Sequence, residues 1–284
     1  MLHRFVLKLS CEDRPGIVAN LMGLLATKGG NIIESQQFDD LETGRFFMRV
    51  VFDIAGLDES GVRALIAPAV SQFTIEAELR LQAEPVKVML MVSKFDHCLG
   101  DLLYRYRIGE LAMKVVGIIC NHPREALNVS MIGEIPFHYL PIIEKTKHEQ
   151  ETKIKNLVLD SSAELVVLAR YMQILSDDLV SFLSGRCINI HHSFLPGFKG
   201  AKPYHQAYAR GVKMIGATAH YVTADLDEGP IIHQDVEAIS HADTPEDLVR
   251  KGRDIERRVL ATALRYHLEH RVLLNNGKTV VFKT

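Results

Sequence analysis

The stretch Ile188–Gly197 reads INIHHSFLPG and decides how the second half of the chain folds. Its first residues alternate between apolar and polar, which predicts a strand whose side chains point alternately to two faces. Ile188 and Ile190 then share a buried face, while Asn189 and His191 share the other. An amide donor and an imidazole therefore stand side by side at the end of a strand, where they can stabilise an oxyanion and move a proton.

Strand and helix patterns alternate through the region that leads to this stretch. Three nearly continuous apolar runs predict strands covered on both faces at residues 86–92, 114–120 and 164–169, with helices at 100–105 and from 144–151 onward. Such a βαβ series predicts an α/β fold with a Rossmann-like, mostly parallel, doubly wound sheet and helices on both faces. Ligands bind to such sheets at the carboxyl ends of the strands, where Asn189 and His191 lie.

The last part of the chain continues this pattern. Apolar runs predict strands at 215–222 and 231–236, joined by the polar loop 223–230. Thr244–Asp247 reads TPED, which places a capping threonine, a proline and two acids at the start of a helix that continues to about residue 270. The sequence NNG at residues 275–277 predicts a hairpin turn before a last strand at 279–282.

The first eighty residues have a different order of elements. We expect strand, helix, strand, strand, helix and strand at residues 5–9, 17–26, 32–38, 46–52, 59–73 and 75–81. This is the order of the ferredoxin-like α+β fold. Residues 82–85 then read as a linker, so we divide the chain into a first domain over 1–82 and a second domain over 86–284.

Composition narrows the class of protein. A chain of 284 residues with 47% hydrophobic residues is long enough for two domains with cores of their own. The net charge of −2 predicts no nucleic-acid or membrane partner, and no apolar run is long enough to span a bilayer. The four cysteines lie far apart, and the first nine residues alternate like a strand rather than forming a signal peptide. These features predict a cytoplasmic protein with reduced thiols.

The first domain contains two short motifs, Asp13–Val18, which reads DRPGIV, and Gly29–Ile32, which reads GGNI. Through these residues it resembles the ACT family of small regulatory domains. It implies that the domains pair into a homo-oligomer and bind an amino-acid effector near the strand-to-helix turn. The binding residues would be Asp13, Gly16 and Asn31. A second interpretation stays open, in which this turn only begins a helix and the domain only dimerises.

The second domain contains a spaced pattern of Asn189-x-His191, then Ser193-x-Leu195-Pro196-x-Phe198-x-Gly200, then His220 and Asp227-x-Gly229. Through this pattern it resembles the folate-dependent formyl transfer family. The resemblance implies that the catalytic set is Asn189, His191 and Asp227. It also implies a folate pocket lined, largely through backbone groups, by Met172, Gln173, Ile174, Leu175, Val222 and Thr223.

The chemistry implied by this resemblance is coherent. A formyl group on a folate nitrogen is an amide-like carbonyl, so nucleophilic attack on it creates a tetrahedral oxyanion. Asn189 can donate a hydrogen bond to that oxygen, and such a donor lowers the barrier by ~3–4 kcal/mol. Protonated His191 can donate a second hydrogen bond and pass its proton to the leaving nitrogen. Asp227 can orient the imidazole and bind the attacking water, while Asp225, the rival acid, is interpreted as a solvated loop residue.

One departure from the family pattern concerns the acceptor. Members that transfer the formyl group to a sugar phosphate have a turn rich in Gly and Ser after the first strand of this domain. Here Ser93–Gly100 reads SKFDHCLG, and the bulky Phe95 and anionic Asp96 replace the small residues that a phosphate site needs. Water is then left as the nucleophile, which implies hydrolysis of 10-formyltetrahydrofolate to tetrahydrofolate and formate. Two alternatives stay open, namely transfer to a non-phosphorylated acceptor, and a folate or amino-acid sensor without turnover.

The remaining histidines and cysteines point to no further chemistry. Adjacent residues rarely face each other, so His97 and Cys98 are not expected to form a nucleophile–base pair, and Cys98 is interpreted as a packed thiol. The histidines lack metal-binding spacings such as H-E-x-x-H, so no metal is expected, and no cofactor beyond the folate substrate. His220 is interpreted as a strand residue that supports the site, and His192 as a turn cap.

Overall fold

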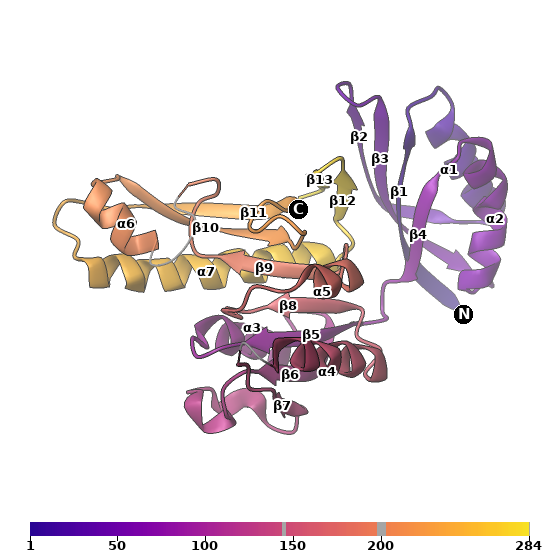
Figure 1. The fold of residues 1–284 in the computed structure, drawn as a ribbon. Helices are drawn as coiled ribbons and strands as arrows, with labels where there is room; N and C mark the ends of the chain where they lie inside the picture. Colours follow the sequence, from indigo (N-terminus) through magenta and orange to yellow (C-terminus); the bar gives the residue numbers. More distant parts are fainter. Residues whose placement is uncertain (144–145, 198–202, 284) are drawn as a thin grey trace. The chain divides into compact units, whose positions relative to one another are not determined.

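The computed structural model describes residues 1–143, 146–197 and 203–283. Contacts divide the chain into two compact units, Met1–Pro85 together with Glu269–Thr284, and Val86–Leu268 (Figure 1). Each unit has a hydrophobic core of its own. Among the helices of the described residues, none is both long and apolar enough to cross a membrane.

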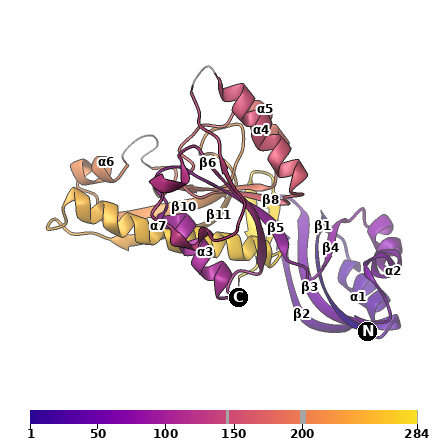
Figure 2. The same cartoon turned by 90° about the horizontal axis from the view of Figure 1, so that it is seen from below.

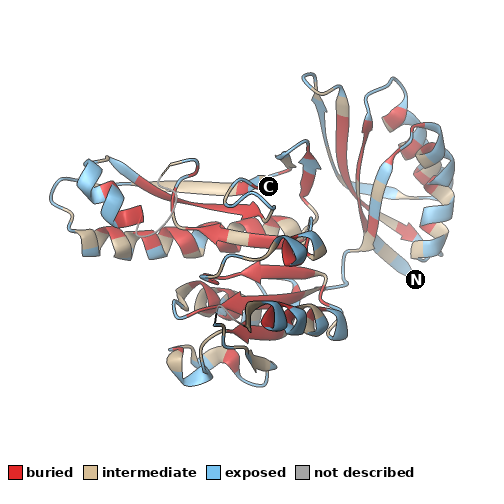
Figure 3. Ribbon diagram, viewed as in Figure 1, coloured by how far each residue is buried: buried red, intermediate tan, exposed pale blue. Residues whose placement is uncertain are grey.

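The first unit contains an antiparallel sheet and two helices. Its elements are β1 (Leu2–Glu12), α1 (Ile17–Thr27), β2 (Asn31–Asp40), β3 (Arg45–Ala55), α2 (Glu59–Gln72) and β4 (Glu76–Leu81). The strand order is β2-β3-β1-β4, and every neighbouring pair is antiparallel. Alternate residues of the central strands, such as Leu7 and its partner Val50, form one core with Leu21 of α1 and Ile66 of α2 (Figure 3). The predicted ferredoxin-like order is confirmed.

The end of the chain adds a hairpin to this unit. β12 (Val272–Asn275) and β13 (Lys278–Val281) pair around the predicted turn. Leu273 and Phe282 pack on Phe47, which lies on the face of β3 opposite to its core-facing residues Phe46 and Met48. The hairpin therefore covers apolar surface that the two helices do not reach.

A buried arginine also ties the end of the chain to β3. Arg49 is 1% exposed, and its Nε and Nη2 donate to the carbonyl oxygen of Glu269 at 3.1 and 3.0 Å. Its Nη1 lies 3.0 Å from one carboxylate oxygen of Glu34, and Arg271 donates to the other at 3.0 Å. A buried guanidinium needs such acceptors. Glu269 thus supplies a hydrogen-bond acceptor for the buried Arg49 of β3, and residues 269–284 belong with the first unit. This corrects the predicted domain boundary, which assigned these residues to the second domain.

The three residues predicted to bind an effector do not converge within one chain. Asp13 and Gly16 follow β1, whose last residue pairs with Arg45 at the start of β3. Asn31 pairs with Asp53 near the other end of the same strand. Eight residues of strand correspond to about 26 Å. A site that contains all three residues therefore needs a second copy of the chain.

The second unit is built around a seven-stranded sheet. In chain order its elements are β5 (Val86–Val92), α3 (His97–Arg107), β6 (Met113–Cys120), η1 (Arg124–Ala126), η2 (Ser130–Ile132), β7 (Phe137–Tyr139), α4 (Lys147–Asp160), β8 (Leu165–Leu168), α5 (Asp177–Phe182), β9 (Cys187–His191), α6 (Pro203–Arg210), β10 (Met214–Tyr221), β11 (Ile231–Ala238) and α7 (Pro245–Leu268). The order in the sheet is β11-β10-β9-β8-β5-β6-β7. Strands β9 to β7 in this order are parallel, whereas β10 is antiparallel to both of its neighbours.

Helices cover both faces of this sheet. Ile154 of α4 and Leu179 of α5 pack against Met89 and Val166 on one face. Helices α3 and α7 contact each other and cover the opposite face (Figure 2). The predicted mostly parallel, Rossmann-like sheet with helices on both faces is confirmed.

Five short elements of this unit were not predicted from the sequence, namely η1, η2, β7, α5 and α6. For α5 a signal was available, because Ser176 caps the helix by accepting a hydrogen bond from the backbone N–H of Leu179 at 3.3 Å. Helix α3 begins at His97, earlier than predicted, because its first turn lies inside the Phe95 stretch. Helix α4 begins at Lys147, and the predicted start at residue 144 lies outside the described residues.

We predict that Glu34→Gln destabilises the first unit by about 1–3 kcal/mol, because Arg49 and Arg271 then face each other without a carboxylate between them. Hydrogen exchange of the β3 amides in the full-length protein measures this loss. Glu42→Gln is the control, since the pair that Glu42 forms with Lys278 is exposed and should change stability by less than about 0.5 kcal/mol. Equal protection in both variants would contradict the assigned role of Glu34.

Candidate active site

The catalytic candidates on β9 lie beside a histidine of the neighbouring strand. In the register of β9 and β10, His220 lies directly opposite Asn189. The Nδ2 of Asn189 is 3.3 Å from the Nε2 of His220. Asn189 and His191 line the same pocket, as the strand alternation predicts for residues two apart.

His220 orients the amide of Asn189. The Nδ1 of His220 lies 2.9 Å from the carbonyl oxygen of Tyr221, which can only accept, so Nδ1 carries the proton. Burial lowers the pKa of His220 and keeps the ring neutral. Its Nε2 is then an acceptor, and Asn189 must turn its NH2 group toward it. The second N–H of that amide is available to a ligand.

His191 and Asp227 form the central contact of the site. The Nδ1 of His191 lies 3.2 Å from Oδ1 of Asp227, and their side chains are only 6% and 11% exposed. Burial alone would raise the pKa of the Asp227 carboxyl, but the hydrogen bond and charge of His191 outweigh it, and the net shift is downward. The Nε2 of His191 is buried and has no hydrogen-bond partner among the described residues. The ring is therefore held at one nitrogen and open to substrate at the other.

A tight loop after β10 positions Asp227 for this contact with His191. Asp227 has a φ of 59°, a left-handed conformation that aspartate tolerates better than most residues. Two residues later, a Cβ on Gly229 would lie 1.7 Å from the carbonyl oxygen of Tyr221. The backbone N–H of Tyr221 also donates to the carbonyl oxygen of Pro230 at 2.9 Å. The Asp-x-Gly spacing thus folds the loop closely against the end of β10.

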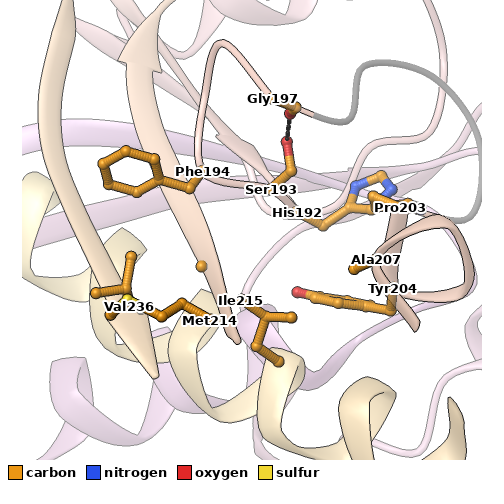
Figure 4. A pocket seen from close by; sticks show the side chains of 11 residues that line it. His192, Ser193, Phe194, Gly197, Pro203, Tyr204, Ala207, Met214, Ile215 and Val236 are labelled. Carbon is orange, nitrogen blue, oxygen red and sulfur yellow. Dashed lines mark hydrogen bonds between the residues drawn. The ribbon is translucent and has the colours of Figure 1, made fainter. Parts of the chain in front are cut away.

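The loop after β9 is anchored by its own polar groups. The hydroxyl of Ser193 donates to the carbonyl oxygen of Gly197 at 2.7 Å (Figure 4). The hydroxyl of Thr218 on β10 donates to the carbonyl oxygen of Ser193 at 2.9 Å. These bonds explain the serine of the predicted motif. Two other motif positions, Phe198 and Gly200, lie outside the described residues.

All nine residues predicted to be catalytic or to bind folate line one pocket of about 310 Å³. They are Asn189, His191, Asp227, Met172, Gln173, Ile174, Leu175, Val222 and Thr223. Asp225, the rival acid, does not line it. The volume is at the lower end for a small-molecule site, and the residues that line the pocket present a largely apolar surface.

The loop after β8 presents backbone groups to this pocket. The backbone N–H of Met172 donates to the hydroxyl of Ser93 at 3.0 Å, and that of Gln173 is bonded within the loop. Among the described residues, the backbone N–H groups of Ile174 and Leu175 donate no hydrogen bond. These two groups are therefore available to a ligand, whereas the first two are already engaged.

Two pocket residues were missed from the sequence. Arg170 and His192 both line the pocket, and a nitrogen of the Arg170 guanidinium donates to the Nδ1 of His192. His192 was interpreted only as a turn cap. The available signal was the place of Arg170, directly after the buried strand β8 at the ligand-binding edge of the sheet.

A cluster near the pocket contains metal-ligand atom types but is arranged as a hydrogen-bonded network. The ligand atoms of His97, Cys98 and Glu256 lie within 4.8 Å of one another. Burial and the nearby Glu256 charge raise the pKa of the Cys98 thiol well above its ordinary value. The guanidinium of Arg170 also lies 3.3 Å from Glu256. The carboxylate of Glu256 is therefore already paired with Arg170 and in contact with His97.

Comparisons with known proteins cover both units. Residues 86–264 match the family described as Formyl transferase, and residues 5–60 match the ACT domain. The chain is 49% identical to formyltetrahydrofolate deformylase of Corynebacterium sp. (strain P-1) over 282 residues, which are 99% of this chain and 98% of that protein. The chain belongs to the formyltetrahydrofolate deformylase family.

Solved structures show the same relationship to the deformylase family. The structure of formyltetrahydrofolate deformylase from Burkholderia mallei ATCC 23344 matches with a TM-score of 0.93 and 49% identity, covering 99% of this chain and all of that one. A phosphoribosylglycinamide formyltransferase from Coxiella burnetii matches with a TM-score of 0.65 and 30% identity over 70% of this chain and 94% of its own. The deformylase family therefore shares much of its architecture with formyltransferases. The resemblances to the ACT and formyl transfer families are confirmed.

In this member of the deformylase family, the turn after β5 is not arranged as a phosphate cradle. Asp96 stands at the start of α3, and its carboxylate accepts a hydrogen bond from the backbone N–H of Asn128. The guanidinium of Arg170 lies over the ring of Phe95, with Cζ 5.7 Å from the ring centroid. The negative charge of Asp96 beside the helix N-terminus disfavours an anionic ligand there.

We predict that Gly229→Ala destabilises the second unit by about 1–3 kcal/mol, because the new methyl group overlaps the carbonyl oxygen of Tyr221 and the loop must move. Denaturant unfolding measures the change. Gly100→Ala is the matched control, since a Cβ there meets only Val129 at an ordinary 3.5 Å and α3 should gain up to about 1 kcal/mol. A Gly229→Ala protein as stable as the wild type would show that the loop tolerates a side chain.

Proposed function

We propose that this chain hydrolyses 10-formyltetrahydrofolate to tetrahydrofolate and formate, with water as the nucleophile and Asn189, His191 and Asp227 as the catalytic residues. Its membership of the deformylase family supports the reaction. The observation that carries the assignment of residues is the contact of His191 with Asp227 beside Asn189, at the wall of a pocket that also contains the predicted folate loop.

Asn189 stabilises the oxyanion in this proposal. One N–H of its amide is engaged with His220, which fixes the plane of the group before substrate arrives. The other N–H donates to the formyl oxygen as that oxygen gains charge. A fixed donor of this kind needs no reorganisation during the reaction and contributes ~3–4 kcal/mol.

His191 and Asp227 carry out the proton transfers in this proposal. Water attacks the formyl carbon and gives up a proton to Oδ2 of Asp227, while protonated His191 donates from Nε2 to the oxyanion. The bond between the carbon and N10 then breaks, and N10 takes the proton from His191. The proton held by Asp227 then passes to His191, which restores both residues, and the formic acid loses its own proton to solvent, so that tetrahydrofolate and formate are released. The Nδ1 contact with Asp227 keeps Nε2 directed at the reacting atoms.

The folate lies along the loops that follow β8 and β10. The free backbone N–H groups of Ile174 and Leu175 suit the polar edge of a pterin, and the largely apolar lining suits its faces. Val222 and Thr223 line the other side of the same pocket. No metal or further cofactor is required by this mechanism. Four buried free cysteines fit the reducing cytoplasm, which we propose as the compartment.

Two other functions remain in competition with hydrolysis. The turn at Phe95 and Asp96 disfavours a phosphorylated acceptor, but it does not exclude a neutral one. A sensor without turnover would keep the pocket but would not need the His191–Asp227 contact. Incubating the protein with 10-formyltetrahydrofolate alone separates the three functions. Formate release without an acceptor supports hydrolysis, release only with an acceptor supports transfer, and folate binding without release supports a sensor.

We predict that His191→Ala and Asp227→Asn lower kcat for formate release by about 10²–10⁴-fold, because each removes proton transfer in the transition state. Steady-state kinetics of the purified variants measure the effect, and circular dichroism checks their folding. Asp225→Asn is the matched control, because this neighbouring acid lies outside the pocket and should keep wild-type turnover. Wild-type rates in either catalytic variant would overturn the assignment.

We also propose that the first unit pairs with a second copy and binds an amino-acid effector there. Asp13 and Gly16 of one copy would meet Asn31 of the other, since the three residues do not meet in one chain. The expected results are a homo-oligomer in light scattering and a changed rate of formate release with one member of an amino-acid panel. Asp13→Asn and Asn31→Ala should abolish that response. A monomeric protein whose rate of formate release no amino acid changes would contradict both the pairing and the effector site.

A further inference from the structure

A buried carboxylate on α7 faces the back of the active site. Glu256 is 1% exposed and accepts a hydrogen bond from the hydroxyl of Tyr204 at 2.7 Å. Its other oxygen lies 2.8 Å from the Nε2 of His97 and 3.3 Å from the Nε of Arg170. Burial alone would raise the pKa of Glu256, but its partners outweigh this and the net shift is downward. Glu256 is therefore an anion in the interior of the second unit.

Arg170 connects this anion to the folate pocket. Its side chain is held by Glu256, by the ring of Phe95 and by His192, and the residue is only 9% exposed. Its backbone has a φ of 68°, which is unfavourable for any residue with a side chain. Such a conformation persists only where the surroundings hold it, and it is frequent at functional sites.

His192 is the residue on which Arg170 acts. Because a guanidinium can only donate, the Nδ1 of His192 must accept, and its proton lies on Nε2. The ring of His192 is stacked on that of His191, with centroids 5.3 Å apart and an angle of 26° between planes. On its other side His192 lines a second cavity of about 370 Å³ with Pro203 and Tyr204 (Figure 4). His192 thus lies between two cavities and directly against the catalytic ring.

We propose that Glu256 and Arg170 are positioning residues, which act through His192 to hold the imidazole of His191 in place and to keep its stacked neighbour uncharged during proton transfer. This proposal rests on the proposed function, because it assigns these residues to the same reaction. It differs in content, since neither residue needs to touch the reacting atoms. Glu256 fixes the guanidinium of Arg170, this guanidinium fixes the ring of His192, and His192 packs on His191.

The charges around the two imidazoles explain why this arrangement favours the reaction. His191 must carry a positive charge when it donates to the oxyanion, and a second imidazolium stacked on it would oppose that charge. The groups that face the pair are Arg170 after β8, Asp227 from the loop after β10, His220 on β10, Tyr204 on α6, and Glu256 on α7 with His97 on α3. Burial and the charge of Arg170 together keep His192 neutral, and Glu256 compensates the charge of Arg170.

We predict that Glu256→Gln and Arg170→Met each lower kcat for formate release by about 10–100-fold with little change in KM, because the catalytic ring is misplaced while the folate loops are intact. Arg258→Gln is the control on the same helix, since its pair with Asp235 is solvent-exposed. It should retain wild-type kcat. Wild-type kcat in both test variants would overturn the proposal.

The double variant separates positioning from stability. Each single variant leaves a buried charge without its partner and lowers the midpoint of thermal unfolding, whereas the double variant removes both charges and should recover much of that loss. If Glu256 acts through Arg170, the double variant has the kcat of Arg170→Met and no lower. Recovery of kcat together with stability would show that the two residues are merely structural.

The pH profile provides a second measurement. Burial and the charge of Arg170 lower the pKa of His192 to about 4, so in the wild type this ring is neutral near pH 7. Arg170→Met removes the second cause, and the acid limb of kcat/KM should move to higher pH because His192 then gains its proton earlier. The limb should not move in Arg258→Gln, and an unmoved limb in Arg170→Met would contradict the role of His192.

Failure of this proposal can be told from failure of the proposed function. The wild type must release formate from 10-formyltetrahydrofolate and His191→Ala must not, or the catalytic assignment itself is wrong. If that pair of results holds while Arg170→Met and Glu256→Gln behave like the wild type, the reaction stands and only the positioning role is lost.

Discussion

The contact between Nδ1 of His191 and Oδ1 of Asp227 is the interaction on which the candidate active site depends. It joins the end of β9 to a loop that begins after β10, so both strands and the loop must be correctly placed for it to form. The antiparallel pairing of β9 with β10 brings the strand ends together. The absence of a side chain at Gly229 lets the loop fold back against Tyr221. The same register places His220 opposite Asn189 and so orients the amide.

The sequence predicted this part of the molecule well because local rules determine it. A strand has a side-chain period of two, so Asn189 and His191 had to face the same way. A βαβ series has one favoured handedness, and its ligand edge is at the carboxyl ends of the strands. The loop residues from Met172 to Leu175 follow a neighbouring strand and therefore reach the same pocket. The family resemblance added Asp227, which no local rule connects to β9.

Other features could not be predicted because they depend on partners distant in the sequence. Arg49 reads as a polar position on a strand, and nothing in its surroundings reveals that the carbonyl of Glu269 covers it. Glu256 lies on a long helix with many charged residues, and only tertiary packing shows that this one carboxylate is buried against Arg170. An alternation of apolar and polar residues indicates which face of an element is covered, but it does not indicate which segment of the chain covers that face. The boundary of the first unit was misplaced for that reason.

The pairs Arg170–Glu256 and His191–Asp227 explain why a charged arginine is tolerated near His191, the proposed catalytic histidine. An isolated guanidinium there would oppose the positive charge that His191 needs. Because Glu256 lies against Arg170, their opposite charges compensate each other, and Asp227 is the charged group in contact with His191. The neutral ring of His192 separates the two pairs, so Arg170 can fix the tautomer of His192 without withdrawing Asp227 from His191. Arg170 also lies over the ring of Phe95 at the turn after β5, and both Arg170 and His192, which stacks on His191, line the candidate pocket.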